Sequence, residues 1–96
     1  MEKIKFEPVE SNDRFKVLRA KPKKGAIMPA HLADKDGFLL IDEGEIEFVL
    51  GNETILMKGE DSLRIPAGVV HQIHAKTACR ILLVLDTKVK IQFVNS

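Results

Sequence analysis

Turn signals divide this chain into pieces too short for much besides β-strands. Each signal contains a Gly or a Pro, and they lie at 22–25, 42–44, 51–52, 58–60 and 66–68. Between them lie runs of roughly four to eight residues rich in Ile, Val, Leu and Phe, which is typical of strands in a sandwich or barrel. The one stretch with room for a helix, 28–36, is interrupted by Pro29 and followed by Gly37, and both residues disfavour a helix. The sequence therefore predicts an all-β fold of about nine strands.

The pair Gly51-Asn52 predicts a hairpin. Gly accepts the positive φ angle that two-residue hairpin turns require, so we expect this pair to join strands at Glu45–Leu50 and Glu53–Met57. At the end of the chain, residues 88–94 alternate between polar and apolar side chains. A strand with this alternation must cover its apolar side, so it either completes a sheet or pairs with another subunit.

Length and composition limit the class of protein. With 96 residues the chain has room for one domain, and it has no apolar run near the ~20 residues that span a bilayer. The charged N-terminus lacks the apolar core of a signal peptide, and Cys79 has no second cysteine with which to pair. We therefore expect a cytoplasmic protein without a membrane partner.

The charges are unevenly distributed along the chain. Residues 1–24 carry eight Lys or Arg against four acids, whereas residues 34–61 carry nine acids against two Lys. In the basic part the charges alternate with apolar residues, as on the wet face of a sheet. The chain also has no Trp or Tyr to stack on bases. We therefore expect no nucleic-acid partner.

Two segments carry a recognisable spacing of Gly, Pro and His. Gly25 is followed after five residues by His31, and Gly44 closes that segment. Gly59 is followed after six residues by the run Pro66-Ala67-Gly68-Val69-Val70-His71. These spacings resemble the two sequence motifs of the cupin family.

The resemblance covers residues 25–85 and implies a fold. That fold is all-β: a cupin-type double-stranded β-helix, also called a jelly-roll barrel. On this reading residues 1–96 are a single domain, in which terminal strands at 1–21 and 88–94 flank the segment that carries the motifs.

The resemblance also implies a metal site, of which this sequence keeps half. A metal-binding cupin supplies three His and one Glu. Carried over position by position, His31 is the first His and His71 the last, while Ala33 stands at the second His position and Gly37 at the Glu position. A complete metal site is therefore not expected and no cofactor is assigned, while a divalent metal (Zn²⁺, Fe²⁺, Ni²⁺ or Mn²⁺) at the incomplete site stays an open alternative.

Alternation along strands predicts which residues share the pocket. Residues two apart in a strand face the same side, so a pocket that contains His31 and His71 also takes their alternate neighbours. His74 is three residues from His71 and faces outward. The predicted pocket residues are His31, Ala33, Gly37, Leu39, Ile41, His71 and Ile73.

Three functions remain open for such a pocket. The first is a binding protein in which an apolar pocket with one or two imidazoles holds a small organic molecule. The second is a metal-dependent enzyme of the oxygenase or isomerase type, in which Asp34 or Asp36 turns inward to join His31 and His71 at an irregular site. In the third, the His pair is packed or hydrogen-bonded inside a barrel whose role is assembly or regulation.

The terminal strands also predict assembly. Strands that alternate charged and apolar residues at both ends of the chain need a partner face, and so small a barrel gains core by pairing. We therefore expect a homodimer with two-fold symmetry.

Overall fold

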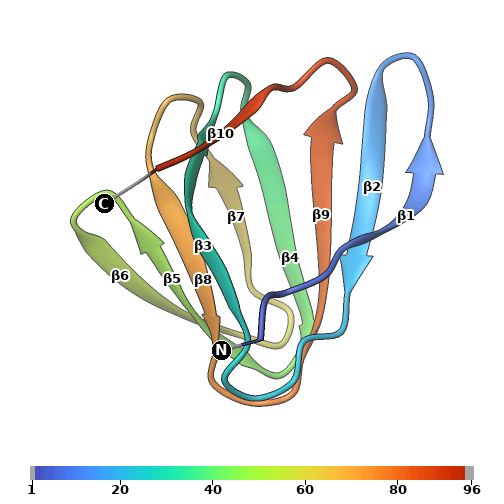
Figure 1. The fold of residues 1–96 in the computed structure, drawn as a ribbon. Helices are drawn as coiled ribbons and strands as arrows, with labels where there is room; N and C mark the ends of the chain where they lie inside the picture. The colour runs from blue at the N-terminus through green and yellow to red at the C-terminus, as the bar shows by residue number, and fades with distance from the viewer. Residues whose placement is uncertain (1, 95–96) are drawn as a thin grey trace.

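The structure of this chain, a computed structural model, describes residues 2–94 and consists of strands and loops (Figure 1). No helix in this part of the chain is long and apolar enough to cross a membrane. The ten strands are β1 (Glu7–Ser11), β2 (Phe15–Ala20), β3 (Ile27–Ala33), β4 (Gly37–Glu43), β5 (Glu45–Leu50), β6 (Glu53–Lys58), β7 (Ser62–Ile65), β8 (His71–Ala75), β9 (Arg80–Asp86) and β10 (Ile91–Phe93). The all-β prediction is confirmed.

The strands form two five-stranded antiparallel sheets that face each other. The first has the order β1-β2-β9-β4-β7 and the second the order β10-β3-β8-β5-β6. Within residues 2–94, only β1–β2 and β5–β6 are consecutive strands of one sheet, and every other connection crosses to the opposite sheet. This repeated crossing is the path of a double-stranded β-helix. The two sheets stay open at their edges as a sandwich instead of closing into one hydrogen-bonded barrel.

The two predicted turns around β5 have different structures. Gly51-Asn52 forms the expected hairpin, in which Leu50 pairs with Glu53. The signal at 42–44 is instead a corner: β4 and β5 belong to different sheets and are separated by the single residue Gly44. The two strands that this turn joins therefore do not pair with each other.

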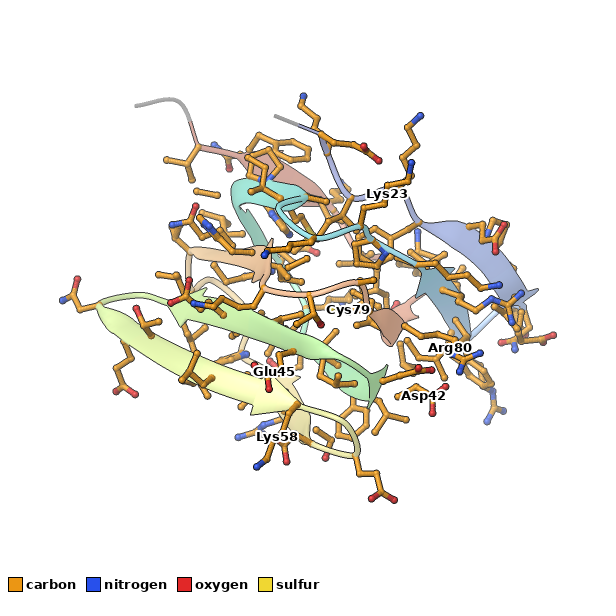
Figure 2. All side chains as sticks on the ribbon, turned by 90° about the horizontal axis from the view of Figure 1, so that it is seen from below. Lys23, Asp42, Glu45, Lys58, Cys79 and Arg80 are labelled. Atoms are coloured by element: carbon orange, nitrogen blue, oxygen red, sulfur yellow. The ribbon has the colours of Figure 1, made fainter. Side chains whose placement is uncertain are left out.

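An ion-pair cluster lies beside this corner, at the end of the molecule shown in Figure 2. Arg80 approaches Asp42 to 3.0 Å and also contacts Glu43. Cys79 is buried next to it and donates a hydrogen bond to the carbonyl oxygen of Glu45 at 3.2 Å. The lone thiol is thus part of the packing at the corner.

The ends of the chain complete the sheets within one molecule. β1 pairs with β2, and β10 pairs with β3, with Phe93 opposite His31. Before β1, the chain lies against the start of β3, where Lys3 and Ile27 form a parallel bridge. Intramolecular pairing therefore accounts for the terminal strands.

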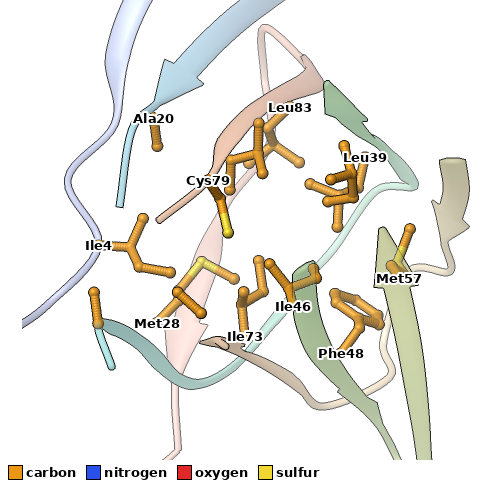
Figure 3. Close-up of a cluster of buried hydrophobic side chains, with 14 of the residues drawn as sticks. Ile4, Ala20, Met28, Leu39, Ile46, Phe48, Met57, Ile73, Cys79 and Leu83 are labelled. Atoms are coloured by element: carbon orange, nitrogen blue, oxygen red, sulfur yellow. The ribbon is translucent and has the colours of Figure 1, made fainter. Parts of the chain in front are cut away.

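The core lies between the sheets (Figure 3). Its largest fully buried side chains are Leu39, Ile41, Ile46, Phe48, Ile73 and Ile81. Each comes from the inward side of an alternating strand, as in the burial of β4 at Gly37, Leu39 and Ile41. Burying one such side chain stabilises the fold by about 1.5–3 kcal/mol.

Candidate functional site

Two imidazoles meet between β3 and β8. His31 and His71 are direct neighbours in the antiparallel ladder of these strands, and their ring centroids lie 4.2 Å apart in an edge-to-face arrangement. The two residues are almost completely buried, with exposed fractions of 5% and 4%. The structure therefore brings together the His of the first motif and the His of the second.

A β-bulge in β3 turns His31 inward. From Met28 to His31 the chain advances three residues, while its partner strand advances only two, from Ile73 to His71. Without the extra residue, Met28 and His31 would face opposite sides of the sheet, whereas both are buried. Pro29 lies in this bulge, where its missing N–H interrupts no ladder hydrogen bond.

The ring nitrogens of the pair have defined roles. Nδ1 of His31 lies 2.8 Å from the carbonyl oxygen of Pro29, and Nδ1 of His71 lies 3.1 Å from that of Val69. Since a carbonyl oxygen can only accept, Nδ1 carries the hydrogen in each neutral ring and Nε2 keeps its lone pair. Within residues 2–94, the hydrogen bonds of both rings are made through Nδ1. The site therefore offers two acceptor nitrogens close together.

Burial favours the neutral form of His71. The loss of water around the ring lowers the pKa of His71 below its ordinary value of 6.5, and this effect outweighs the hydrogen bond with Val69, which raises the pKa. The charge of a protonated His31 lowers the pKa of His71 further. At neutral pH, Nε2 of His71 is therefore an acceptor and not a donor.

The pair lies on the wall of a small cavity beside an apolar groove. The volumes are about 30 Å³ for the cavity and about 270 Å³ for the groove. The two adjoin, since they share the lining residues Met28, His31, Leu83, Leu85 and Ile91. The other lining residues are Ala33, Lys35, Gly37, Ile65 and His71 in the cavity and Lys3, Ile4, Phe6, Leu18, Pro29 and Phe93 in the groove.

The charged side chains that line the cavity and the groove are all positive. They are Lys3 and Lys35, and none of the lining residues is an Asp or Glu. The remaining side chains are aliphatic or aromatic, apart from the two imidazoles. A cationic ligand would therefore find no carboxylate on this wall.

The predicted pocket residues divide into two layers. Ala33 and Gly37 line the cavity together with the His pair. Leu39, Ile41 and Ile73 do not line it, because they lie fully buried in the core. Alternate residues of a strand share a face but lie about 6–7 Å further along it. The cavity therefore reaches the His pair, Ala33 and Gly37, and the next residues along the same face of each strand already belong to the core.

The acids that were candidates for a third metal ligand are engaged elsewhere. Asp34 accepts a hydrogen bond from the backbone N–H of Lys90 at 2.7 Å. Asp36 accepts one from the backbone N–H of Ala67 at 2.7 Å. Both carboxylates are exposed, so neither turns inward to join the His pair, as the metal-dependent alternative required.

The residues present do not make up the four-ligand metal site that the motifs imply. Ala33 and Gly37 offer no ligand atom at the positions of the second His and the Glu. Within residues 2–94, no group of three or more His, Cys, Asp and Glu side chains is placed to hold a metal ion. The arrangement supplies two imidazole nitrogens and an apolar wall.

The sequence reasoning missed the side of the site built by the ends of the chain. Ile4 and Phe6 come from the segment before β1, and Ile91 and Phe93 come from β10. The ring of Phe93 lies 5.4 Å from that of His31. Alternation in residues 88–94 was the available signal, but it does not say which surface the apolar side covers.

Comparisons with known proteins agree with this architecture. A family model described as "Cupin domain" matches residues 19–85. A search of curated proteins found no match.

Several solved structures share the fold. A cupin 2 domain-containing protein from Halorhodospira halophila has a TM-score of 0.87 at 17% identity, over 98% of this chain and 72% of that one. An uncharacterized conserved protein with a double-stranded β-helix domain from Klebsiella pneumoniae has a TM-score of 0.85 at 15% identity, covering 98% and 86%. The polyketide cyclase RemF from Streptomyces resistomycificus has a TM-score of 0.85 at 19% identity, covering 99% and 75%. At these identities the likeness concerns the fold alone.

Proposed function

This chain belongs to the cupin family, and on that basis we propose that it binds a small organic molecule in the space beside His31 and His71. The observation that carries the proposal is the pair of acceptor nitrogens next to an apolar groove of about 270 Å³. Mostly apolar pockets with a few polar groups that fix orientation are the usual form of small-molecule sites.

The geometry supports a ligand with two parts. Its body is apolar and lies in the groove against Phe6, Leu18 and Phe93. Its polar end carries a hydroxyl or N–H group, because Nε2 of a neutral His can only accept. The lysines at the wall favour a neutral or anionic molecule over a cation.

A metal-dependent enzyme is the second candidate function. It is supported by the hydrogen bond of each Nδ1 with a backbone carbonyl oxygen, which is the usual way of orienting a metal-binding imidazole. Since residues 2–94 supply two ligands at this site, the remaining ligands would have to come from water or substrate. Elemental analysis of protein purified without added metal separates the candidates, and a stoichiometric metal would overturn the first.

A pair of matched probes tests the binding proposal. p-Cresol and p-xylene have nearly the same shape, but only p-cresol has a hydroxyl donor. One net hydrogen bond contributes about 0.5–1.5 kcal/mol, so we expect p-cresol to bind roughly two- to twelvefold more tightly, since 1.4 kcal/mol is a factor of ten. Titrations followed by NMR at about pH 8 keep the phenol and His71 neutral.

The double variant His31→Phe with His71→Phe is the control. It keeps two aromatic rings in place and removes both acceptors, so it should bind the two probes equally. Equal binding of the probes by the unmodified protein would overturn the role of the imidazoles. Failure of both probes to bind would overturn the proposal as a whole and favour a packing role for the pair.

A further inference from the structure

A hollow between the segment before β1 and the end of β2 is lined by three cationic side chains. Its volume is about 260 Å³. Lys5, Arg19 and Lys21 bring positive charge to its wall, and Glu7 brings the one negative charge among the lining residues. The other lining residues are Phe6 and Ala20. We refer to this site below as the basic hollow.

The strand register explains why these charges meet. Ala20 is buried in the core, so its neighbours Arg19 and Lys21 point to the opposite, outer side of the sheet. Glu7 pairs with Arg19 in the antiparallel ladder of β1 and β2. The same register, continued by two residues on each side, sets Lys5 beside Lys21. The two lysines therefore come from different segments and reach the hollow from opposite sides.

The lysines of the hollow lack the counter-charge that the neighbouring arginine has. One step beyond the end of the β2–β9 ladder, Lys21 stands beside Arg80, and the two line an adjoining pocket. Arg80 is paired with Asp42 and Glu43. Neither Lys5 nor Lys21 forms an ion pair with any of residues 2–94. Like charges side by side on adjacent strands destabilise a sheet, and an anion bound between the lysines would relieve this repulsion.

The ion pair between Arg19 and Glu7 is loose. Nε of Arg19 lies 3.5 Å from Oε1 of Glu7, and this buried nitrogen makes no hydrogen bond within residues 2–94. A firm pair of these groups has N–H···O contacts of about 2.7–2.9 Å. The side chain of Arg19 is 42% exposed, so the rest of its guanidinium can donate to a ligand in the hollow.

We propose that the basic hollow binds a phosphate dianion, either free or as the phosphoryl group of a small monoester. Two lysines without partners balance two negative charges, close to the charge of about −1.5 to −2 that a phosphate monoester carries at pH 7. Lys and Arg donors are the usual ligands of phosphate oxygens. One water molecule takes about 30 Å³, so the hollow has room for a phosphoryl group and part of the molecule that carries it.

Exposure of the site predicts modest affinity. Lys5 and Lys21 are both exposed, and solvent weakens contacts between exposed charges. We therefore expect a dissociation constant in the roughly millimolar range. The anion site does not depend on the proposed function, because the basic hollow and the groove beside His31 share Phe6 and otherwise have different lining residues.

Titrations with inorganic phosphate and with glycerol phosphate test the proposal. At about pH 8 both probes are mostly dianions, and we expect NMR shifts of the backbone amides at residues 5–7 and 19–21. Acetate at the same ionic strength of about 0.1 M carries a single charge and should bind several-fold more weakly. Tighter binding of glycerol phosphate would assign the site to a phosphate monoester, and equal binding of the two probes would assign it to free phosphate.

Charge variants in the hollow should have effects of opposite sign. Lys5→Gln and Lys21→Gln each remove one donor and should weaken phosphate binding about three- to tenfold. Glu7→Gln removes the carboxylate that competes for Arg19 and should tighten phosphate binding about twofold or more. Lys21→Arg keeps the charge and should keep the binding.

Two control variants change the net charge by the same amounts at a distance. They are Lys88→Gln and Glu53→Gln, and both residues are exposed. Lys88 lies beyond the far end of β9, which is about 20 Å long, and Glu53 lies on β6 in the other sheet. Because the Debye length is about 10 Å at 0.1 M, neither change should alter phosphate affinity.

Three outcomes would overturn the proposal. Phosphate at about 20 mM that leaves residues 5–7 and 19–21 unshifted would show that the hollow binds no such anion. Equal losses in Lys88→Gln and Lys21→Gln would show a general attraction to the net charge of the protein. Unchanged affinity in folded Lys5→Gln and Lys21→Gln would show that other groups hold the phosphate.

Discussion

The corner at Gly44 offers a stringent test of how this fold is held. Gly44 has a φ angle of +93° and carries the chain from one sheet to the other. A Cβ atom at this position would lie 2.4 Å from the carbonyl oxygen of Ala78 and 2.8 Å from Cα of Cys79. We predict that Gly44→Ala strongly destabilises the protein.

The loss has two parts that can be estimated separately. A side chain at positive φ costs about 1–2 kcal/mol, and overfilling a packed site costs about 1–3 kcal/mol more. The second part is not easily relieved, because the obstructing atoms belong to the backbone. The segment that holds them is tied to the corner by a hydrogen bond from the N–H of Lys76 to the carbonyl oxygen of Glu45. The sum is about 2–5 kcal/mol, a large share of the ~5–15 kcal/mol that stabilises a typical domain.

Gly25→Ala is the matched control. Gly25 has a φ angle of +88°, but a Cβ atom there would have nothing within 4 Å. Only the backbone cost of about 1–2 kcal/mol should remain.

Urea unfolding followed by circular dichroism measures both variants, since the chain has no Trp or Tyr for fluorescence. The steric reasoning is refuted if the two variants lose the same free energy of unfolding.

Two further predictions concern the candidate site. Because burial lowers the pKa of His71 below 6.5, the folded protein binds fewer protons than the unfolded chain as the pH falls through that value. Its free energy of unfolding should therefore decrease below about pH 6.5, and His71→Phe should lose this dependence in urea titrations at several pH values. The double change Ala33→His with Gly37→Glu should add the two absent ligands and tighten Ni²⁺ or Zn²⁺ binding in calorimetry. The atom nearest to a Cβ at position 37 would be a methyl carbon of Leu85, at 3.0 Å, which can shift, and the next would be the carbonyl oxygen of Val84, at an ordinary contact distance of 3.5 Å. Equally weak binding by a folded variant would mean that the first motif is misaligned.

Local patterns in the sequence were sufficient to predict the strands and to predict that the two His residues lie in one pocket. The alternation that buries Gly37, Leu39 and Ile41 depends only on the two-residue period of a strand. The Gly51-Asn52 hairpin depends only on neighbouring residues. The spacing of Gly, Pro and His resembled the two sequence motifs of a family with a common fold, so His31 and His71 could be assigned to one pocket.

How deeply each inward side chain is buried, and which strand lies next to it, were decided by the tertiary structure. Alternation placed Leu39, Ile41 and Ile73 on the inward face, but only the stacking of two sheets makes them core and leaves Ala33 and Gly37 at the cavity. The same holds at Gly44. The turn signal in the sequence is the same for a hairpin and for a corner between sheets, because the two differ only in which strand β5 pairs with.

The groove beside the His pair shows the same division. Ile4 and Phe93 are distant in sequence, and they meet only because β10 and the segment before β1 both lie against β3. The sequence alone determined which way each side chain faces, since that follows from the period of a strand. The tertiary structure determined what each side chain faces, since that depends on pairings between residues far apart in the chain.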